Sequence, residues 1–205
     1  MSSDLHAARQ GIGRGLAIVV TGPSGAGKNS VIDAVMERLP NLVYSISYTS
    51  RECRDCEQPG KDYFFVSKEE FQARIDRNDF LEHVTYVGDH YGTSRSQIEE
   101  AMAAGFDVVL NIEVEGARKV MRSGIGDHRV IYVFLTPSSL DELEQRLRKR
   151  NTEDEQEMAK RLETAREEMK ALAEFDYLVL NDAIEDAIDE LRAIILAERS
   201  RITQT

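Results

Sequence analysis

The stretch Gly22-Pro-Ser-Gly25-Ala-Gly27-Lys28, which directly follows the apolar run Leu16 to Val20, decides the fold. After it, apolar residues recur at helical spacing until Pro40 ends the pattern. A strand that leads through a glycine-rich turn into a helix is the context of a P-loop, in which backbone N–H groups and the helix N-terminus bind phosphate and the lysine adds a mobile charge. The stretch therefore predicts that nucleotide phosphates are bound by Gly22, Pro23, Ser24, Gly25, Ala26, Gly27 and Lys28.

The residue after Lys28 departs from the P-loop pattern. The pattern has Ser or Thr there, whose hydroxyl coordinates the magnesium ion of the nucleotide, but this chain has Asn29 followed by Ser30. An amide oxygen can ligate a hard cation, although Asn is longer and bulkier than Ser. We therefore expect Asn29 and Ser30 to complete the nucleotide site, with Asn29 as a weakened or rearranged Mg²⁺ ligand.

Short β-branched runs alternate with amphipathic stretches along most of the chain. This alternation predicts an α/β fold with a parallel sheet flanked by helices on both faces. The expected strands are Leu16 to Val20, Leu42 to Ser47, Phe106 to Glu113, Arg129 to Leu135 and Asp176 to Asn181.

The sequence predicts three parts of the chain. Residues 1–15 have no periodicity and are expected to be a flexible tail. Residues 49–94 predict a small inserted α+β lobe, whose elements are expected at Asp62 to Val66, Ser67 to Arg77 and Phe80 to Val87. Residues 16–48 and 95–205 form the P-loop core, which includes a densely charged helical lid at about 146–162.

Composition excludes several classes of protein. The 205 residues carry 37 acidic and 26 basic side chains, a net charge of −11, which argues against general affinity for nucleic acid or an anionic membrane. No apolar run approaches the roughly 20 residues of a membrane helix, and no signal peptide is evident, so a cytoplasmic protein is expected. Cys53 and Cys56 have C-x-x-C spacing but no second ligand pair, and are expected to be incidental thiols. The sequence does not distinguish a monomer from a homodimer.

The inserted lobe contains side chains suited to a nucleoside monophosphate. Arg51 and Arg54 with Tyr63 suit a phosphate monoester, because guanidinium groups bind it bidentately and a phenol donates one more hydrogen bond. Glu82 and the run Tyr91-Gly92-Thr93 offer a carboxylate beside hydroxyl groups, which can distinguish guanine from adenine.

With these motifs the chain resembles the guanylate kinase family from Leu16 to Arg199. The family pattern of S-x-T-T-R-x-x-R, G-x-D-Y, F-L-E and Y-Y-G-T is met, in order, by Ser47 with Arg51 and Arg54, Gly60 to Tyr63, Phe80 to Glu82 and His90 to Thr93. The resemblance implies that Arg51, Arg54, Tyr63 and Tyr91 bind the phosphate of GMP. It also implies that Ser47, Glu82 and Thr93 contact guanine, with Gly92 in the same site.

A second departure follows from the same resemblance. The family usually has an acid-x-Asp-x-Gln-Gly run at the end of a strand, where this chain has Asn111-Ile-Glu113-Val-Glu115-Gly116. Glu113 can still accept from guanine or orient the shell of the magnesium ion. Loss of the carboxylate at Asn111 weakens the case for the metal again.

The charged segment contains the arginines of the implied lid. By resemblance Arg150 and Arg161 match the lid arginines, while Arg146 and Arg148 fit an exposed helix face better. The two lid helices are expected to be joined by the turn Asn151 to Glu155. Asn181 resembles the residue that flanks the adenine of ATP, although Asn-Asp is also a common helix-capping pair.

The sequence therefore predicts a guanylate kinase that transfers the γ-phosphate of ATP to GMP and dGMP. Lys28, Arg51, Arg150 and Arg161, together with Mg²⁺, would neutralise charge during transfer. Two alternatives stay open. One is a GMP-binding module with weak or lost turnover, suggested by Asn29 and Asn111, and the other is a kinase for another small phosphate ester.

Overall fold

The computed structural model describes residues 15–86, 88–149 and 155–202 of the chain. The strands are β1 (Ala17–Thr21), β2 (Leu42–Tyr44), β3 (Tyr48–Thr49), β4 (Phe64–Phe65), β5 (Phe80–Tyr86), β6 (Asp89–Ser94), β7 (Asp107–Asn111), β8 (Val130–Thr136) and β9 (Tyr177–Leu180). The helices are α2 (Lys28–Arg38), α3 (Lys68–Asp76), α4 (Arg95–Ala103), α5 (Val114–Ser123), α6 (Leu140–Lys149), α7 (Glu155–Met169) and α8 (Ile184–Arg199), with the 3₁₀ turn η1 (Leu172–Glu174).

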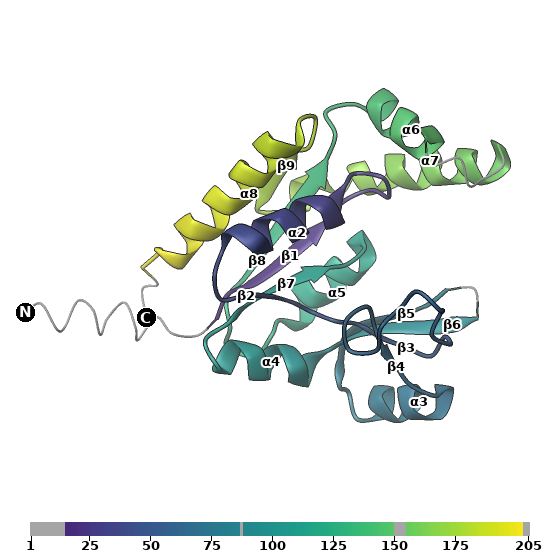
Figure 1. Ribbon diagram of the computed structural model, residues 1–205, viewed down its shortest axis with the longest axis vertical. Helices are drawn as coiled ribbons and strands as arrows, with labels where there is room; N and C mark the ends of the chain where they lie inside the picture. The colour runs from purple at the N-terminus through teal and green to yellow at the C-terminus, as the bar shows by residue number, and fades with distance from the viewer. Residues whose placement is uncertain (1–14, 87, 150–154, 203–205) are drawn as a thin grey trace, which may run out of the picture. The chain divides into compact units, whose positions relative to one another are not determined.

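Five strands form a parallel sheet flanked by helices, in the order β2-β7-β1-β8-β9 (Figure 1). All five residues of β1 are buried, as expected for a central strand of a parallel sheet. The predicted α/β fold is confirmed. Four strands, β2, β4, β7 and β9, are shorter than predicted. Strand β2 ends at Tyr44 because Tyr48 already pairs in another sheet, and β7 ends at Asn111 because α5 begins at Val114.

The described residues form two compact units. The first, here called the P-loop unit, contains residues 18–42, 109–114 and 131–202 within the described parts of the chain. The second unit contains residues 15–17, 43–108 and 115–130. The predicted lobe at 49–94 lies within the second unit, and its exact boundaries remain a prediction.

The P-loop unit has an apolar core that fixes its helices. Helix α2 packs against α8 (Figure 1). Helices α6 and α7, predicted from the charged segment, pack through one buried cluster, so the apolar positions in a mostly charged sequence are enough to pair them. The cluster is Leu143, Leu147, Met158, Leu162 and Ala165. The turn predicted between these helices lies outside the described residues, apart from Glu155 at the start of α7.

The second unit contains a four-stranded sheet in the order β4-β3-β6-β5. Strands β5 and β6 form an antiparallel hairpin in which Glu82 pairs with Thr93 and Val84 with Tyr91. Buried aromatic rings of Tyr48, Phe71 and Phe80 hold helix α3 on this sheet. The pairing matters for the site, because it brings two segments of the predicted guanine motif into direct register.

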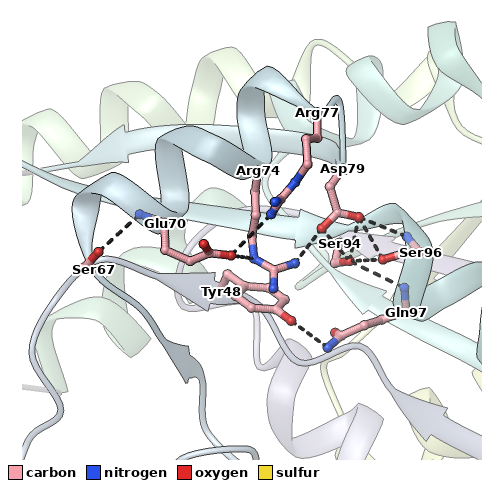
Figure 2. Close-up of polar contacts among 9 residues, drawn as sticks. All are labelled: Tyr48, Ser67, Glu70, Arg74, Arg77, Asp79, Ser94, Ser96 and Gln97. Carbon is pink, nitrogen blue, oxygen red and sulfur yellow. Dashed lines mark hydrogen bonds and ion pairs between the residues drawn. The ribbon is translucent and has the colours of Figure 1, made fainter.

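A polar network fixes the elements of the second unit (Figure 2). The guanidinium of Arg74 lies 4.2 Å from the centre of the Tyr48 ring and forms ion pairs with Glu70 at 3.1 Å and Asp79 at 2.7 Å. Asp79 also accepts a hydrogen bond of 2.8 Å from the hydroxyl of Ser96. These contacts join α3, the residue before β5 and the first turn of α4.

Candidate functional site

The P-loop wraps as its glycines predict. Gly22, Gly25 and Gly27 all have positive φ, at 138°, 87° and 89°, values that residues with a Cβ rarely adopt. A Cβ at Gly22 would collide with the backbone carbonyl of Leu135, and one at Gly25 would lie 2.8 Å from Leu147 Cδ2. The backbone can therefore turn its N–H groups inward only because these positions are glycine.

Two side chains tie the loop together. Lys28 donates from Nζ to the carbonyl oxygens of Gly22 at 2.5 Å and Pro23 at 3.2 Å. The buried side chain of Asn181 donates from Nδ2 to the carbonyl oxygen of Ala26 at 2.7 Å. Asn181, predicted from the family to flank adenine, thus also supports the loop from the end of β9. Ser24 on the loop and Ser30 in the first turn of α2 are both exposed.

Two of the residues that depart from the family pattern, Asn29 and Asn111, contact each other. Asn111 donates from Nδ2 to Oδ1 of Asn29 at 2.6 Å. They meet because β7 lies beside β1 in the sheet, so the end of β7 adjoins the loop that follows β1. The sequence pointed to each residue separately, but it did not predict that they would form a pair.

Two carboxyl groups lie near each other in the P-loop unit. Glu113 follows β7 and is exposed, and Glu168 lies on α7. Burial, followed by the nearby Glu113 carboxylate, raises the pKa of Glu168 to about 7, while the positive charge of Lys28 acts in the opposite direction. Glu168 was missed in the sequence, because nothing distinguishes it from its acidic neighbours on a charged helix.

In the second unit, Arg51, which the sequence predicts to bind the GMP phosphate, is paired with a carboxylate. Arg51 donates from Nη1 and Nη2 to the two carboxylate oxygens of Glu57, both at 2.8 Å, and its guanidinium lies 5.4 Å from the centre of the Tyr63 ring. The backbone N–H of Arg54 donates to the same carboxylate at 2.9 Å. These hydrogen bonds, first that from Arg51, lower the pKa of Glu57 to about 2. Glu57 was not predicted, although its spacing of six residues from Arg51 in an acidic loop was available in the sequence.

The phenol groups of the predicted phosphate site also come together. The rings of Tyr63 and Tyr91 lie 5.9 Å apart, edge to face. Hydrogen bonds from Arg51, first to Glu57 and then to Tyr91, raise the pKa of its guanidinium. Burial and the neighbouring Tyr91 raise the pKa of Tyr63, so the Tyr63 phenol stays a protonated donor near neutral pH.

Two of the predicted guanine residues, Glu82 and Thr93, lie opposite each other on the paired strands β5 and β6. Thr93 donates its hydroxyl to Glu82 Oε1 at 2.6 Å, so the carboxylate is already oriented. A Cβ at Gly92 would lie 2.9 Å from the Phe80 ring, which explains the glycine there. Glu82 also lines a hollow of about 300 Å³ with, among others, Lys119 and Arg122. Ser47 is half-buried, and its carbonyl oxygen accepts from the N–H of Phe64 at 2.9 Å.

The predicted lid residues are described only in part. Arg150 and Asn151 lie outside the described residues, and Arg161 lies half-buried on α7. Arg146 pairs with Glu142 at 2.8 Å and Arg148 with Glu144 at 2.7 Å. Both arginines pair with an acid one turn earlier on α6, but only Arg148 is exposed, because the Arg146 side chain is 22% exposed.

Three further observations on the described residues concern other kinds of site. Cys53 and Cys56 are exposed free thiols. In the described ranges, no group of three His, Cys, Asp or Glu side chains could hold a metal ion. Among the helices described there, none has the length and apolar character needed to span a membrane.

A parallel α/β sheet with a wrapped, lysine-ended loop after its first strand defines a P-loop nucleotide-binding protein. The sequence model of the guanylate kinase family matches residues 14–198, and the chain belongs to that family. It is 43% identical to a guanylate kinase of Desulfitobacterium hafniense over 188 residues, 92% of each chain. It is 42% identical to one of Thermotoga maritima over 191 residues, 93% of this chain and 91% of the relative. The crystal structure of guanylate kinase from Anaplasma phagocytophilum matches 92% of this chain and 88% of its own, with 30% identity and a TM-score of 0.72.

Proposed function

We propose that this chain is an ATP:GMP phosphotransferase that makes ADP and GDP from ATP and GMP, and accepts dGMP. The carrying observation is that the family match, over residues 14–198, spans both units. The P-loop unit supplies a phosphate-binding loop, and the second unit supplies a guanidinium and a preoriented carboxylate.

The P-loop would bind the phosphates of ATP through its backbone N–H groups and Lys28 (residues Gly22 to Ser30). Lys28 already lies within the loop, 2.5 Å from the Gly22 carbonyl oxygen, so its charge needs only a change of partner to reach a phosphate oxygen. Asn181 keeps the loop wrapped and is proposed to flank adenine. Prior wrapping lowers the entropy cost of binding, because the N–H groups are oriented before the nucleotide arrives.

The second unit, which contains the proposed lobe at 49–94, would bind GMP. Arg51, Arg54, Tyr63 and Tyr91 would hold its phosphate, since guanidinium and phenol groups donate to phosphate oxygens. Glu82 would accept from the N–H groups of guanine. Its hydrogen bond from Thr93 fixes the carboxylate in one orientation, and adenine does not present the same adjacent donors. Ser47 and Gly92 complete the set that we propose in this unit, and a GMP-binding role for Glu113, which lies in the P-loop unit, stays a prediction from the sequence.

Catalysis would consist of positioning and charge neutralisation. Lys28, Arg51, Arg150 and Arg161 are the proposed cationic residues, the last two from the lid. No general base is required, because a phosphate monoester is already largely ionised near neutral pH. The protein's task is to hold the acceptor phosphate in line with the γ-phosphate and to exclude water.

Magnesium is the proposed cofactor and would enter bound to ATP. When bound, it neutralises charge on the phosphates. The chain's own donor set fits direct coordination poorly: Asn29 has one side-chain oxygen, and it accepts the 2.6 Å hydrogen bond from Asn111. We therefore assign no step of the transfer to a protein-bound ion.

The test is an ADP-release assay with ATP and each of GMP, dGMP, AMP and UMP, with and without magnesium. Turnover on GMP and dGMP alone supports the proposal, and Lys28→Ala should lower kcat by at least about a hundredfold. Lys170→Ala, an exposed lysine on the surface, is the control and should leave kcat unchanged. GMP binding without turnover would instead favour a GMP-binding module. Turnover on another phosphate ester would favour a kinase for that class of substrate. Cytoplasmic location stays a prediction from the sequence.

A further inference from the structure

The hydrogen-bonded amides of Asn29 and Asn111 form a neutral pair at the edge of the P-loop. In the P-loop pattern the position of Asn29 carries a hydroxyl that ligates the Mg²⁺ ion. A carboxylate at the end of a strand, the position of Asn111, commonly organises the water ligands of the ion. Here both positions have changed, and the two side chains satisfy each other at 2.6 Å. The pair therefore differs from a hydroxyl and a carboxylate in both charge and available oxygen.

The contact is a consequence of the sheet. The N–H of Ile112 donates to the carbonyl oxygen of Val20 at 3.3 Å, which holds the end of β7 beside the end of β1. Asn111 is the last residue of β7, and Asn29 is the second residue of α2, directly after the loop. Two residues that lie 82 positions apart are thus fixed beside each other by the backbone.

The amide pair offers less to a cation than a hydroxyl and a carboxylate would. Each amide has one oxygen that can ligate a metal, and the hydrogen bond engages one of the two oxygens. Neither group is charged. A carboxylate at position 111 would attract Mg²⁺ and would also repel nucleotide phosphates that arrive without the ion. Both effects would make nucleotide binding depend more strongly on the metal.

The pair is not what keeps the loop wrapped. Asn181 holds the carbonyl of Ala26 at 2.7 Å, and Lys28 holds the carbonyls of Gly22 and Pro23. The glycine torsions close the rest of the turn. A change at position 29 or 111 therefore alters what the loop presents to an ion while its phosphate-binding backbone is kept.

We propose that Asn29 and Asn111 together form a neutral amide pair. With this pair, nucleotide binding by the P-loop depends less on magnesium than it would with a hydroxyl and a carboxylate at the same positions. The inference rests on the proposed binding of nucleotide phosphates by the loop. It names two specificity-determining residues for the metal form of the nucleotide.

The test measures binding, not turnover. The dissociation constant of ADP is determined by calorimetry with saturating Mg²⁺ and with EDTA, at constant ionic strength. The constant in EDTA divided by the constant with Mg²⁺ gives the dependence on metal. We expect a ratio below about threefold for the unchanged protein, and at least about tenfold larger for the double variant Asn29→Ser/Asn111→Asp. Asn111→Asp alone, which keeps the shape of the side chain, should give most of the increase.

The matched control is Gln145→Glu, which adds the same charge at an exposed position of α6 and should keep the original ratio. Thermal unfolding without nucleotide verifies that each variant is folded. A ratio that is equal, within twofold, in the unchanged protein and the double variant would overturn the proposal, as would failure of ADP to bind under either condition. GMP-dependent turnover of the unchanged protein is assayed in parallel. Turnover, together with equal ratios in the unchanged protein and the double variant, refutes only the role of the amide pair. A larger ratio in the double variant, without turnover by the unchanged protein, refutes only the proposed kinase activity.

Discussion

At the scale of single residues, the most informative contact is the bidentate ion pair between Glu57 and Arg51. The two carboxylate oxygens receive two parallel N–H donors, the geometry of the strongest ion pairs between side chains. Both side chains are largely sheltered, with 13% and 14% exposed. Because the pKa of Glu57 is about 2, the pair persists at any pH suitable for an assay. The carboxylate thus orients the guanidinium that we propose to bind phosphate, and Glu57 is a positioning residue.

Glu57→Gln is therefore expected to weaken GMP binding. Glutamine keeps the shape but loses the charge and one acceptor, so Arg51 is no longer fixed by two bonds. We expect KM for GMP to rise roughly fivefold to tenfold, with kcat changed less than about twofold. Steady-state kinetics with varied GMP measure the split. Glu52→Gln, an exposed acid in the same loop, is the control. A lower KM would mean that Glu57 competes with the phosphate instead of orienting its ligand.

Glu168 gives a second prediction, on the pH dependence of stability. The folded protein keeps this carboxyl protonated up to about pH 7, whereas its ordinary pKa is 4.5. Between these values the folded state binds more protons, so the stability from protonation is complete below pH 4.5 and is lost as pH rises through 7.

Glu168→Gln removes this loss, because glutamine does not ionise. Between pH 5 and 8 we expect the variant to lose about 1 to 2 kcal/mol less stability than the unchanged protein, a figure reduced for the partial exposure of the group. Urea unfolding across this range measures the difference. Glu167→Gln on the same helix should follow the unchanged protein, and parallel curves for both variants would refute the assignment.

At the scale of elements, the network around Arg74 shows how a small unit with few strands stays ordered (Figure 2). Its sheet includes two strands of only two residues, β3 and β4, which supply few ladder hydrogen bonds. The sheltered guanidinium compensates by joining α3 to the segment that leads into β5, and by stacking on the ring of Tyr48. The same network holds the hairpin that carries Glu82 and Thr93.

Arg74→Met should consequently destabilise the protein. The change leaves Asp79, which is 14% exposed, without its cationic partner, at a cost of about 2 kcal/mol. For a chain of this length that cost lowers the melting temperature by roughly 4 to 8 °C. Arg77→Met is the control, because Arg77 is 63% exposed and pairs with the same Glu70; it should cost less than about 0.5 kcal/mol. Equal melting temperatures for the two variants would contradict this account.

The elements also show what could be read from the sequence. The strand, glycines and lysine of the P-loop are contiguous, so local torsions and helical periodicity predict it without knowledge of the fold. The contact of Asn29 with Asn111 depends on which strands are neighbours, and strand order is not written in any local pattern. Glu168 is similar, because its raised pKa depends on burial and on Glu113, both set by tertiary packing. Glu57 lies within a single loop and could have been proposed from its spacing to Arg51.

At the scale of the whole molecule, the two proposed nucleotide sites draw on different compact units. The loop with Lys28 belongs to the P-loop unit, and the hairpin with Glu82 and Thr93 belongs to the second unit. Each ligand stabilises the state that binds it, by an amount set by its concentration relative to its dissociation constant. Damage to one site should therefore cancel the stabilisation by one nucleotide and spare the other.

Thermal unfolding of Lys28→Ala and Glu82→Gln tests this separation. At about 100 times the dissociation constant a ligand adds about 2.7 kcal/mol, or roughly 5 °C or more for a chain of this size. Lys28→Ala should lose the shift caused by ADP and keep the shift caused by GMP, because the lysine belongs to the loop alone. Glu82→Gln should do the reverse, since it removes the acceptor for guanine and leaves the loop untouched. If either variant lost both shifts while its unliganded melting temperature stayed unchanged, the two sites could not be independent in the way their separate units imply.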